Sequence, residues 1–97
     1  MIKHIVIFKW REGVTDVEVS EVLEELHALP GAIEALESYL AAPDLGLTEG
    51  TGDLAIIATV ANAEALRSYL DHPRHVEVVT RLRAMAAGRT AVQVAAD

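Results

Sequence analysis

The chain has 97 residues, of which 8 are basic and 15 are acidic, and its formal net charge is −7. A chain of this length forms one domain, here residues 1–97. An acidic domain has no general attraction for nucleic-acid phosphates or anionic lipids, so we expect no nucleic acid and no membrane among its partners. The absence of cysteine excludes disulfides, a thiol nucleophile and a thiolate metal site. The sequence begins without a signal-peptide pattern, and we expect a cytoplasmic protein.

The chain has many apolar residues, but a large share of their side chains are small. The chain is 52% apolar but only 4% aromatic, and 16 of its residues are alanine. The charges are also unevenly placed, because the segment from Glu12 to Leu66 holds twelve acidic residues and no lysine or arginine. Two interpretations of this segment stay open: a solvated acidic helix face, or a surface that meets basic residues of a partner subunit.

The first predicted element is a strand over residues 2–10, which are rich in β-branched and aromatic side chains. Alternation places His4, Val6 and Phe8 on one face and Ile5 and Ile7 on the other. Both faces are therefore apolar at the centre of the strand, as expected for a strand that is covered on both sides.

A helix follows this strand. Thr15 and Glu18 have the spacing of a capping box, in which each side chain binds the backbone amide of the other residue. Apolar residues then recur at helical spacing from Val19 to Leu29, and Pro30-Gly31 is expected to end the helix.

The rest of the chain predicts two more strands, a further helical region and a last strand. We expect a turn of helix at 32–36, a short strand at 37–42, a glycine-bearing loop at 43–52 and a second clear strand at 53–61. Asn62 caps a helix with Leu66, Tyr69 and Leu70 inside. His72-Pro73 starts another helix with Val76, Val79, Leu82 and Met85 or Ala86 inside, Gly88 ends it, and the last strand covers 89–95.

The element order β-α-β-β-α-β predicts an α+β, ferredoxin-like monomer. Its helices can cover only one face of a four-stranded sheet, which leaves the apolar side of Ile5 and Ile7 open. An open apolar face of this size is an interface. The simplest partner is a second copy laid sheet against sheet, so we expect an obligate homodimer that forms a dimeric α/β barrel.

Several segments resemble a known family: IKHIVIFKW, GDLAIIATV and above all AEALRSYLDHPRHVEVV. Over nearly its whole length the chain is similar to the stress-responsive dimeric A/B barrel (Dabb) domain. The resemblance implies a ferredoxin-like homodimer, and most members have no assigned activity. A few plant members are polyketide cyclases that need no cofactor. They use a first-strand histidine and the tyrosine and last histidine of a Y-x-x-H-P-x-H segment, which correspond to His4, Tyr69 and His75. The cyclases carry a further histidine where this chain has Ala55.

The same three residues can be interpreted from their chemistry. His75 falls in the first turn of a helix, where the partial positive charge disfavours imidazolium, and a neutral imidazole can act as a general base. The Tyr69 phenol could donate a hydrogen bond to an enolate oxygen. The alternatives are structural: His4 and Tyr69 as core residues and His75 as a support of the helix junction. His72 and His75 have the spacing of two metal ligands but no third, so no metal site is expected.

Three functions remain open from the sequence. The first is a stress-associated homodimer that binds an apolar or phenolic small molecule in a pocket of each subunit. The second is a cofactor-independent enzyme, either polyketide-cyclase-like with His75 as general base or monooxygenase-like by analogy of fold. The third is a purely structural oligomer. The loop at 43–53 could cover the pocket as a lid in the first two.

Overall fold

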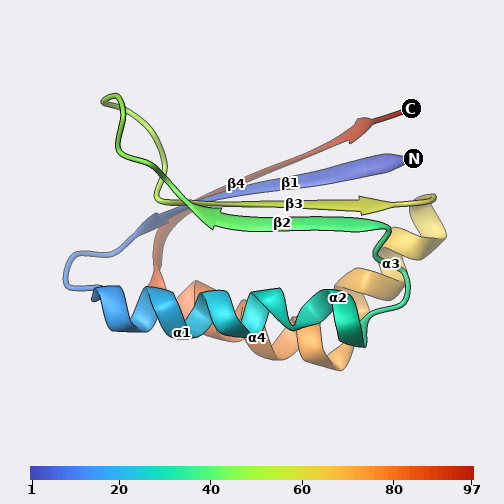
Figure 1. Cartoon of the computed structure of the whole chain (residues 1–97), viewed down its shortest axis with the longest axis horizontal. Coiled ribbons are helices and arrows are strands. Elements are labelled where there is room, and N and C mark those ends of the chain that lie inside the picture. The colour runs from blue at the N-terminus through green and yellow to red at the C-terminus, as the bar shows by residue number, and fades with distance from the viewer.

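The computed structural model describes residues 1–97, which form one sheet and four helices. All four helices lie on the same face of the sheet, as Figure 1 shows, and none is long and apolar enough to cross a membrane. In chain order the elements are β1 (Ile2–Trp10), α1 (Asp16–His27), α2 (Leu29–Ala32), β2 (Ser38–Pro43), β3 (Leu54–Val60), α3 (Ala63–Asp71), α4 (Pro73–Met85) and β4 (Ala86–Ala95).

The strands lie in the order β2-β3-β1-β4, and every neighbouring pair is antiparallel. This order is the split βαβ arrangement, so the ferredoxin-like α+β fold predicted from the sequence is confirmed. A β-bulge interrupts the pairing of β1 with β4, because Lys9 pairs with Gly88 while Trp10 pairs with Ala86. Ala87 is therefore the extra residue on β4.

The first helix begins as its sequence predicts. The Thr15 hydroxyl accepts a hydrogen bond from the Glu18 amide at 3.2 Å, and the Glu18 carboxylate accepts one from the Thr15 amide at 3.1 Å. The prediction for its end was wrong in detail, because α1 stops at His27 and the Leu-Pro-Gly segment forms a short helix of its own, α2. Proline suits the first turn of a helix, since its missing amide hydrogen would have no acceptor there.

The junction between α3 and α4 is defined by two caps. Asn62 accepts a hydrogen bond from the Ala65 amide at 2.9 Å at the start of α3. His72 is the N-cap of α4, and its Nδ1 accepts from the Arg74 amide at 3.1 Å, with Pro73 as the first helical residue. His72 therefore has the structural role expected of it.

Two predictions for the last third of the chain need correction. The buried stripe of α4 consists of Val78, Leu82 and Met85, whereas Val76 is half exposed. The helix ends at Met85 and β4 starts at Ala86, three residues before the predicted start of the strand. The strand starts early because it pairs with β1: the Arg11 amide donates a hydrogen bond to the Met85 carbonyl at 2.8 Å, and Ala86 pairs with Trp10.

The core lies between the helices and the sheet. It is one cluster of 15 buried residues in which most of the largest side chains come from the helices and from β3. The fully buried members with the largest volumes are Tyr69, Leu26, Leu29, Ile33, Leu54, Leu82, Val22 and Val60.

The opposite sheet face carries apolar side chains that nothing covers; we call it the open face. The register aligns Leu40, Ile57, Ile5 and Val92 in one row across all four strands. Leu40 and Val92 are 53% and 51% exposed, and Ile7 beside them is 46% exposed. The two-faced strands predicted from the sequence therefore leave one apolar face in contact with solvent.

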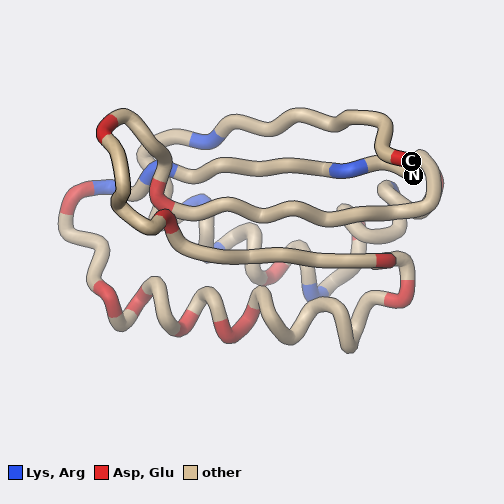
Figure 2. Tube along the Cα trace, turned by 45° about the horizontal axis from the view of Figure 1, so that its top comes forward, with Lys and Arg blue, Asp and Glu red and all other residues tan.

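The acidic helix α1 meets a basic residue of the same chain. Arg81 on α4 binds Glu25 at 2.7 Å and Glu21 at 2.9 Å. Figure 2 shows the acidic residues distributed along α1 and in the loop between β2 and β3. Two carboxylates of the acidic segment therefore form ion pairs within the subunit, whereas the sequence left open an interaction with basic residues of a partner subunit.

Candidate functional site

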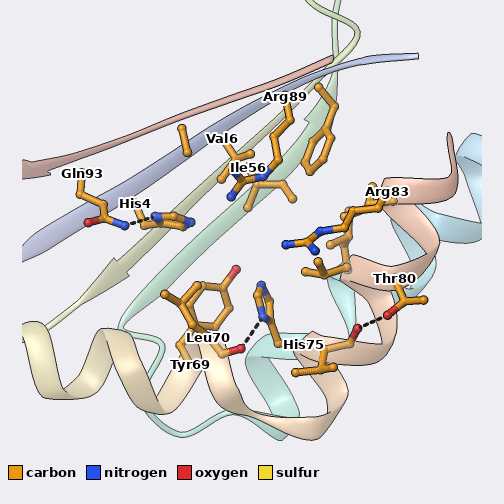
Figure 3. Close-up of a pocket in the computed structure, with 16 residues that line it drawn as sticks. His4, Val6, Ile56, Tyr69, Leu70, His75, Thr80, Arg83, Arg89 and Gln93 are labelled. Atoms are coloured by element: carbon orange, nitrogen blue, oxygen red, sulfur yellow. Dashed lines mark hydrogen bonds between the residues drawn. The ribbon is translucent and has the colours of Figure 1, made fainter. Parts of the chain in front are cut away.

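A cavity lies between the sheet and the helices α3 and α4, with a volume of about 470 Å³. Ten of its 16 lining residues are hydrophobic. The cavity brings His4, Tyr69 and His75 together, from β1, α3 and α4 (Figure 3). It reaches the surface, because Arg89 and Gln93 in its wall are exposed residues of the edge strand β4.

His75 is held in one orientation by the helix junction. Its Nδ1 lies 3.0 Å from the carbonyl oxygen of Leu70, near the end of α3. A carbonyl can only accept, so Nδ1 carries the proton and a neutral His75 has its lone pair on Nε2. Figure 3 shows this second nitrogen facing the cavity. The ring is therefore fixed as a hydrogen-bond acceptor for whatever enters the cavity.

The pKa of His75 lies below 6.5. Burial is the largest cause, the Leu70 carbonyl opposes it, and the charges of Arg89 and His72 add to the lowering. The direction agrees with the expectation from the helix N-terminus, but removal of water from the ring is the main physical reason. His75 is therefore largely uncharged near neutral pH.

Tyr69 is 1% exposed and lies against the His75 ring, with a centroid distance of 4.4 Å. Its hydroxyl points toward the cavity and bonds to none of the residues drawn in Figure 3. Burial raises the pKa of Tyr69 to about 12, against a smaller lowering by Tyr39, so the phenol stays protonated at neutral pH. A protonated phenol facing a cavity is available as a hydrogen-bond donor.

His4 is almost completely buried and has a partner on the neighbouring strand. Gln93, which lies directly opposite on β4, donates from Nε2 to His4 Nδ1 at 3.1 Å. The neutral imidazole then carries its proton on Nε2, and its ring contacts the Tyr69 ring edge-on with centroids 6.3 Å apart. Burial lowers the pKa of His4, and the charges of Arg89 and His75 lower it further.

Sequence reasoning missed Tyr39, a second tyrosine beside this group. Its ring lies edge-on to Tyr69 with centroids 6.4 Å apart, and its hydroxyl is buried without a hydrogen-bond partner. In the sheet register Tyr39 and His4 both pair with Ala58. Tyr39, Ala58 and His4 therefore lie side by side on the three strands β2, β3 and β1. The sequence does not show this neighbourhood, because it depends on the strand register.

Sequence reasoning also missed the charged and amide groups of the cavity. Arg83 on α4 and Arg89 and Gln93 on β4 line it, and both guanidinium groups point into the space above His75 in Figure 3. These residues have no pattern in the sequence that distinguishes them from ordinary surface residues. No group of three or more His, Cys, Asp or Glu residues lies close enough to hold a metal ion.

The loop between β2 and β3 does not cover this cavity, so the expectation of a lid there was wrong. Its residues line a separate cavity of about 660 Å³ on the open face, together with Ile7 and Ala55. Figure 1 shows the loop rising from the sheet on the side away from the helices. Leu45 and Leu47 in this loop are 82% and 80% exposed.

Fold and cavity together define a ferredoxin-like α+β domain with one apolar face left open and a histidine–tyrosine cavity beneath the other. The sequence model of the stress responsive A/B barrel domain, Dabb, matches residues 2–96, and the chain belongs to this family. The resemblance stated from the sequence is confirmed.

Individual relatives agree in fold and differ in how much is known of them. An uncharacterized protein of Streptomyces coelicolor is 36% identical over 88 residues, which span 89% of this chain and 91% of that protein. A dimeric ferredoxin-like protein of unknown function from Thermobifida fusca superimposes with a TM-score of 0.93 at 39% identity, covering 98% of this chain and 90% of that one. A dimeric ferredoxin-like protein of unknown function from Bacteroides fragilis gives 0.82 at 28% identity, with 96% and 93% covered.

Proposed function

We propose that this protein is a homodimer in which each subunit binds one small apolar or aromatic molecule in the cavity beside His75. The observation that carries the proposal is the cavity itself: about 470 Å³, mostly apolar, with His4, Tyr69 and His75 converging in it. This size and lining are typical of small-molecule sites, in which a few polar groups orient an apolar ligand.

The homodimer is supported by the open face. Its central row of Leu40, Ile57, Ile5 and Val92 has no cover within the subunit. Two of the similar solved structures are described as dimeric. A second copy laid on this face would bury the row and leave the cavity, on the opposite side of the sheet, outside the interface.

Ligand binding can be tested by NMR titration with a panel of one-ring and two-ring aromatic compounds. Binding in the cavity would shift the side-chain resonances of His4, Tyr69 and His75 with a saturable dependence on concentration. Saturable binding that leaves these three residues unshifted would contradict the proposal. Leu70→Trp, which adds bulk to the cavity wall, should reduce the affinity, whereas Leu66→Trp, on the same helix and outside the lining, serves as the matched control.

A second candidate function is cofactor-independent acid–base catalysis, and one observation favours it. The bond from His75 Nδ1 to the Leu70 carbonyl leaves Nε2 as a fixed, uncharged base that faces the cavity beside the Tyr69 phenol. Nε2 would take a proton from the carbon next to a substrate carbonyl, and the Tyr69 O–H would stabilise the enolate oxygen. The enolate carbon would then attack a second carbonyl in an aldol-type closure, with the His75 proton passing to the new alkoxide.

The catalytic candidate has its own test, with a poly-β-keto compound as substrate. His75→Ala should lower turnover by about 100-fold or more, which is the usual contribution of a general base. Tyr69→Phe should lower it by about tenfold or more while retaining the ring. His72→Ser keeps a capping side chain at the junction and should retain full activity. Equal rates in wild type and His75→Ala would contradict the mechanism.

Two further alternatives have less support. Oxygenation of the bound molecule rests on likeness of fold to a monooxygenase at low identity. A purely structural dimer would leave the cavity without a role. The family description supports an association with stress without naming a ligand.

A further inference from the structure

The cavity beside His75 holds two cations without counter-ions. Arg83 and Arg89 both line it, and no aspartate or glutamate is among its lining residues. Neither arginine forms an ion pair within the subunit; the arginine of α4 that does so is Arg81, which lies two residues before Arg83 and faces α1. The two free guanidinium groups are therefore directed at the same space (Figure 3).

The cavity lining is positively charged, whereas the whole chain has a net negative charge. The protein has 15 acidic and 8 basic residues, and most of its acidic residues lie along α1 and in loops (Figure 2). With so many carboxylates, an arginine pair on the surface would ordinarily have acidic neighbours. The cavity instead concentrates positive charge beside His4 and His75, whose pKa values are lowered by burial, and beside the protonated Tyr69 phenol.

Arg83 and Arg89 approach the cavity from opposite walls. Arg83 comes from α4 and Arg89 from the edge strand β4, so a ligand group between them would contact both elements. Arg89 is near enough to both histidines to lower their pKa values. Guanidinium groups bind planar carboxylates through paired hydrogen bonds, which are stronger than bonds between neutral groups.

We propose that the ligand of this cavity is a carboxylate with an apolar or aromatic body. The carboxylate binds Arg83 and Arg89 at the mouth, and the body lies inside against Tyr69 and the apolar wall. This inference rests on the proposed function, since it names the chemical class of the molecule that the cavity binds. The anion fixes the direction in which the ligand enters, and it supplies the negative charge that the cavity lining lacks.

The proposal is tested with two probes of the same shape, 2-naphthoate and 2-naphthamide. NMR titration of the wild-type protein should give a dissociation constant for the carboxylate at least about tenfold lower than for the amide, a ratio that corresponds to ~1.4 kcal/mol. Both probes should shift His75 and Tyr69. In Arg83→Gln/Arg89→Gln the two constants should become equal, because only the carboxylate loses affinity.

The matched control is Arg67→Gln/Arg74→Gln, which removes the same charge from exposed positions outside this cavity. It should retain the tenfold preference, and circular dichroism should show that both double variants are folded. Equal affinity of the two probes for wild type, or an equal loss of preference in both double variants, would overturn the carboxylate proposal while the cavity remains a binding site. Failure of both probes to shift His75 and Tyr69 would overturn the proposed binding function as well.

Discussion

The two faces of the same four strands have opposite properties. On the helix side, β1 presents His4, Val6 and Phe8, which are 3–4% exposed, and a cavity with polar groups lies among the apolar ones. On the open side, β1 presents Ile5 and Ile7, and the residues around them are apolar and uncovered. The helix side is complete within one subunit, and the open side is not.

The two faces perform different tasks. The helix side holds all three candidate residues, His4, Tyr69 and His75, and hydrogen bonds within the subunit orient the two histidine rings. The open side holds the apolar surface that the subunit alone cannot bury. Changes on the open side should therefore affect assembly, and changes on the helix side should affect the cavity and the stability of the subunit.

The largest effect is expected from a charge at the centre of the open face. Ile57→Glu would place a carboxylate between Ile5 and Leu40, where a second copy would have to bury it at a cost of several kcal/mol. We expect light scattering at micromolar concentration to show a monomer in place of a dimer. The control is Val17→Glu, which adds the same charge to an exposed valine of α1 and should leave the dimer intact. A dimeric Ile57→Glu would show that the subunits pair through another surface.

A smaller effect is expected where the β2–β3 loop approaches the open face. A methyl group added at Gly52 would collide with the Ile7 side chain and come within 3.3 Å of the Phe8 carbonyl oxygen. Gly52→Ala should therefore lower the free energy of unfolding by about 1–3 kcal/mol, measured by chemical denaturation at one protein concentration. Gly31→Ala meets nothing within 4 Å and should change stability by less than about 1 kcal/mol. Equal stability of the two variants would show that the loop yields freely.

The helix side should respond to pH through its buried histidines. The pKa values of His4 and His75 lie below 6.5 in the folded protein, so the unfolded chain binds more protons between the folded values and 6.5. This contribution to stability is present above pH 6.5 and is lost as the pH falls through that window. Wild type should lose more stability on acidification than His4→Gln/His75→Gln, measured by urea denaturation. A parallel loss in both proteins would show that the two histidines titrate normally.

The smallest effect is expected at the outer rim of the helix layer. Arg81→Gln removes two ion pairs between α4 and α1 that are partly exposed to solvent. Such pairs contribute about 0–1 kcal/mol, and salt screens them. The difference in thermal midpoint between wild type and Arg81→Gln should shrink as sodium chloride is added. A difference that stays constant with salt would assign the effect to packing of the Arg81 stem.

The fold could be predicted because short-range patterns specify its elements, and the three candidate residues could be predicted because the sequence resembles a known family. Alternation in residues 2–10 indicated a strand with two apolar faces, and the capping pattern at Thr15 placed the start of a helix. His4, Tyr69 and His75 were selected through the resemblance to the Dabb family, His4 from the first strand and the other two from the Y-x-x-H-P-x-H segment, and the structure brings them to one cavity. Their roles in binding and catalysis remain predictions.

The parts that could not be predicted depend on how α4 packs on the sheet and on the register of β4 against β1. Helical periodicity predicted a buried stripe that starts at Val76, whereas the position of α4 over the sheet buries Val78 and leaves Val76 half exposed. The same placement directs Arg83 into the cavity and Arg81 toward α1. Gly88 resembles a helix C-cap in sequence, but pairing with β1 extends the strand back to Ala86.

The bulge at Ala87 decides which side of the sheet each residue of β4 faces. Side chains of a strand alternate between the two faces of the sheet. Leaving one residue out of the pairing therefore places every later residue on the face opposite to the one it would have in regular pairing. With Ala87 inserted, Arg89 and Gln93 lie over the cavity and Val92 joins the apolar row. If Ala87 paired with Lys9 instead, Arg89 would lie opposite Ile7 and Val92 opposite His4. The arginine and the amide would then project into the surface expected to meet a second copy. The bulge at this one alanine thus keeps the cavity-lining residues of β4 on one face of the sheet and the residues expected to meet a second copy on the other.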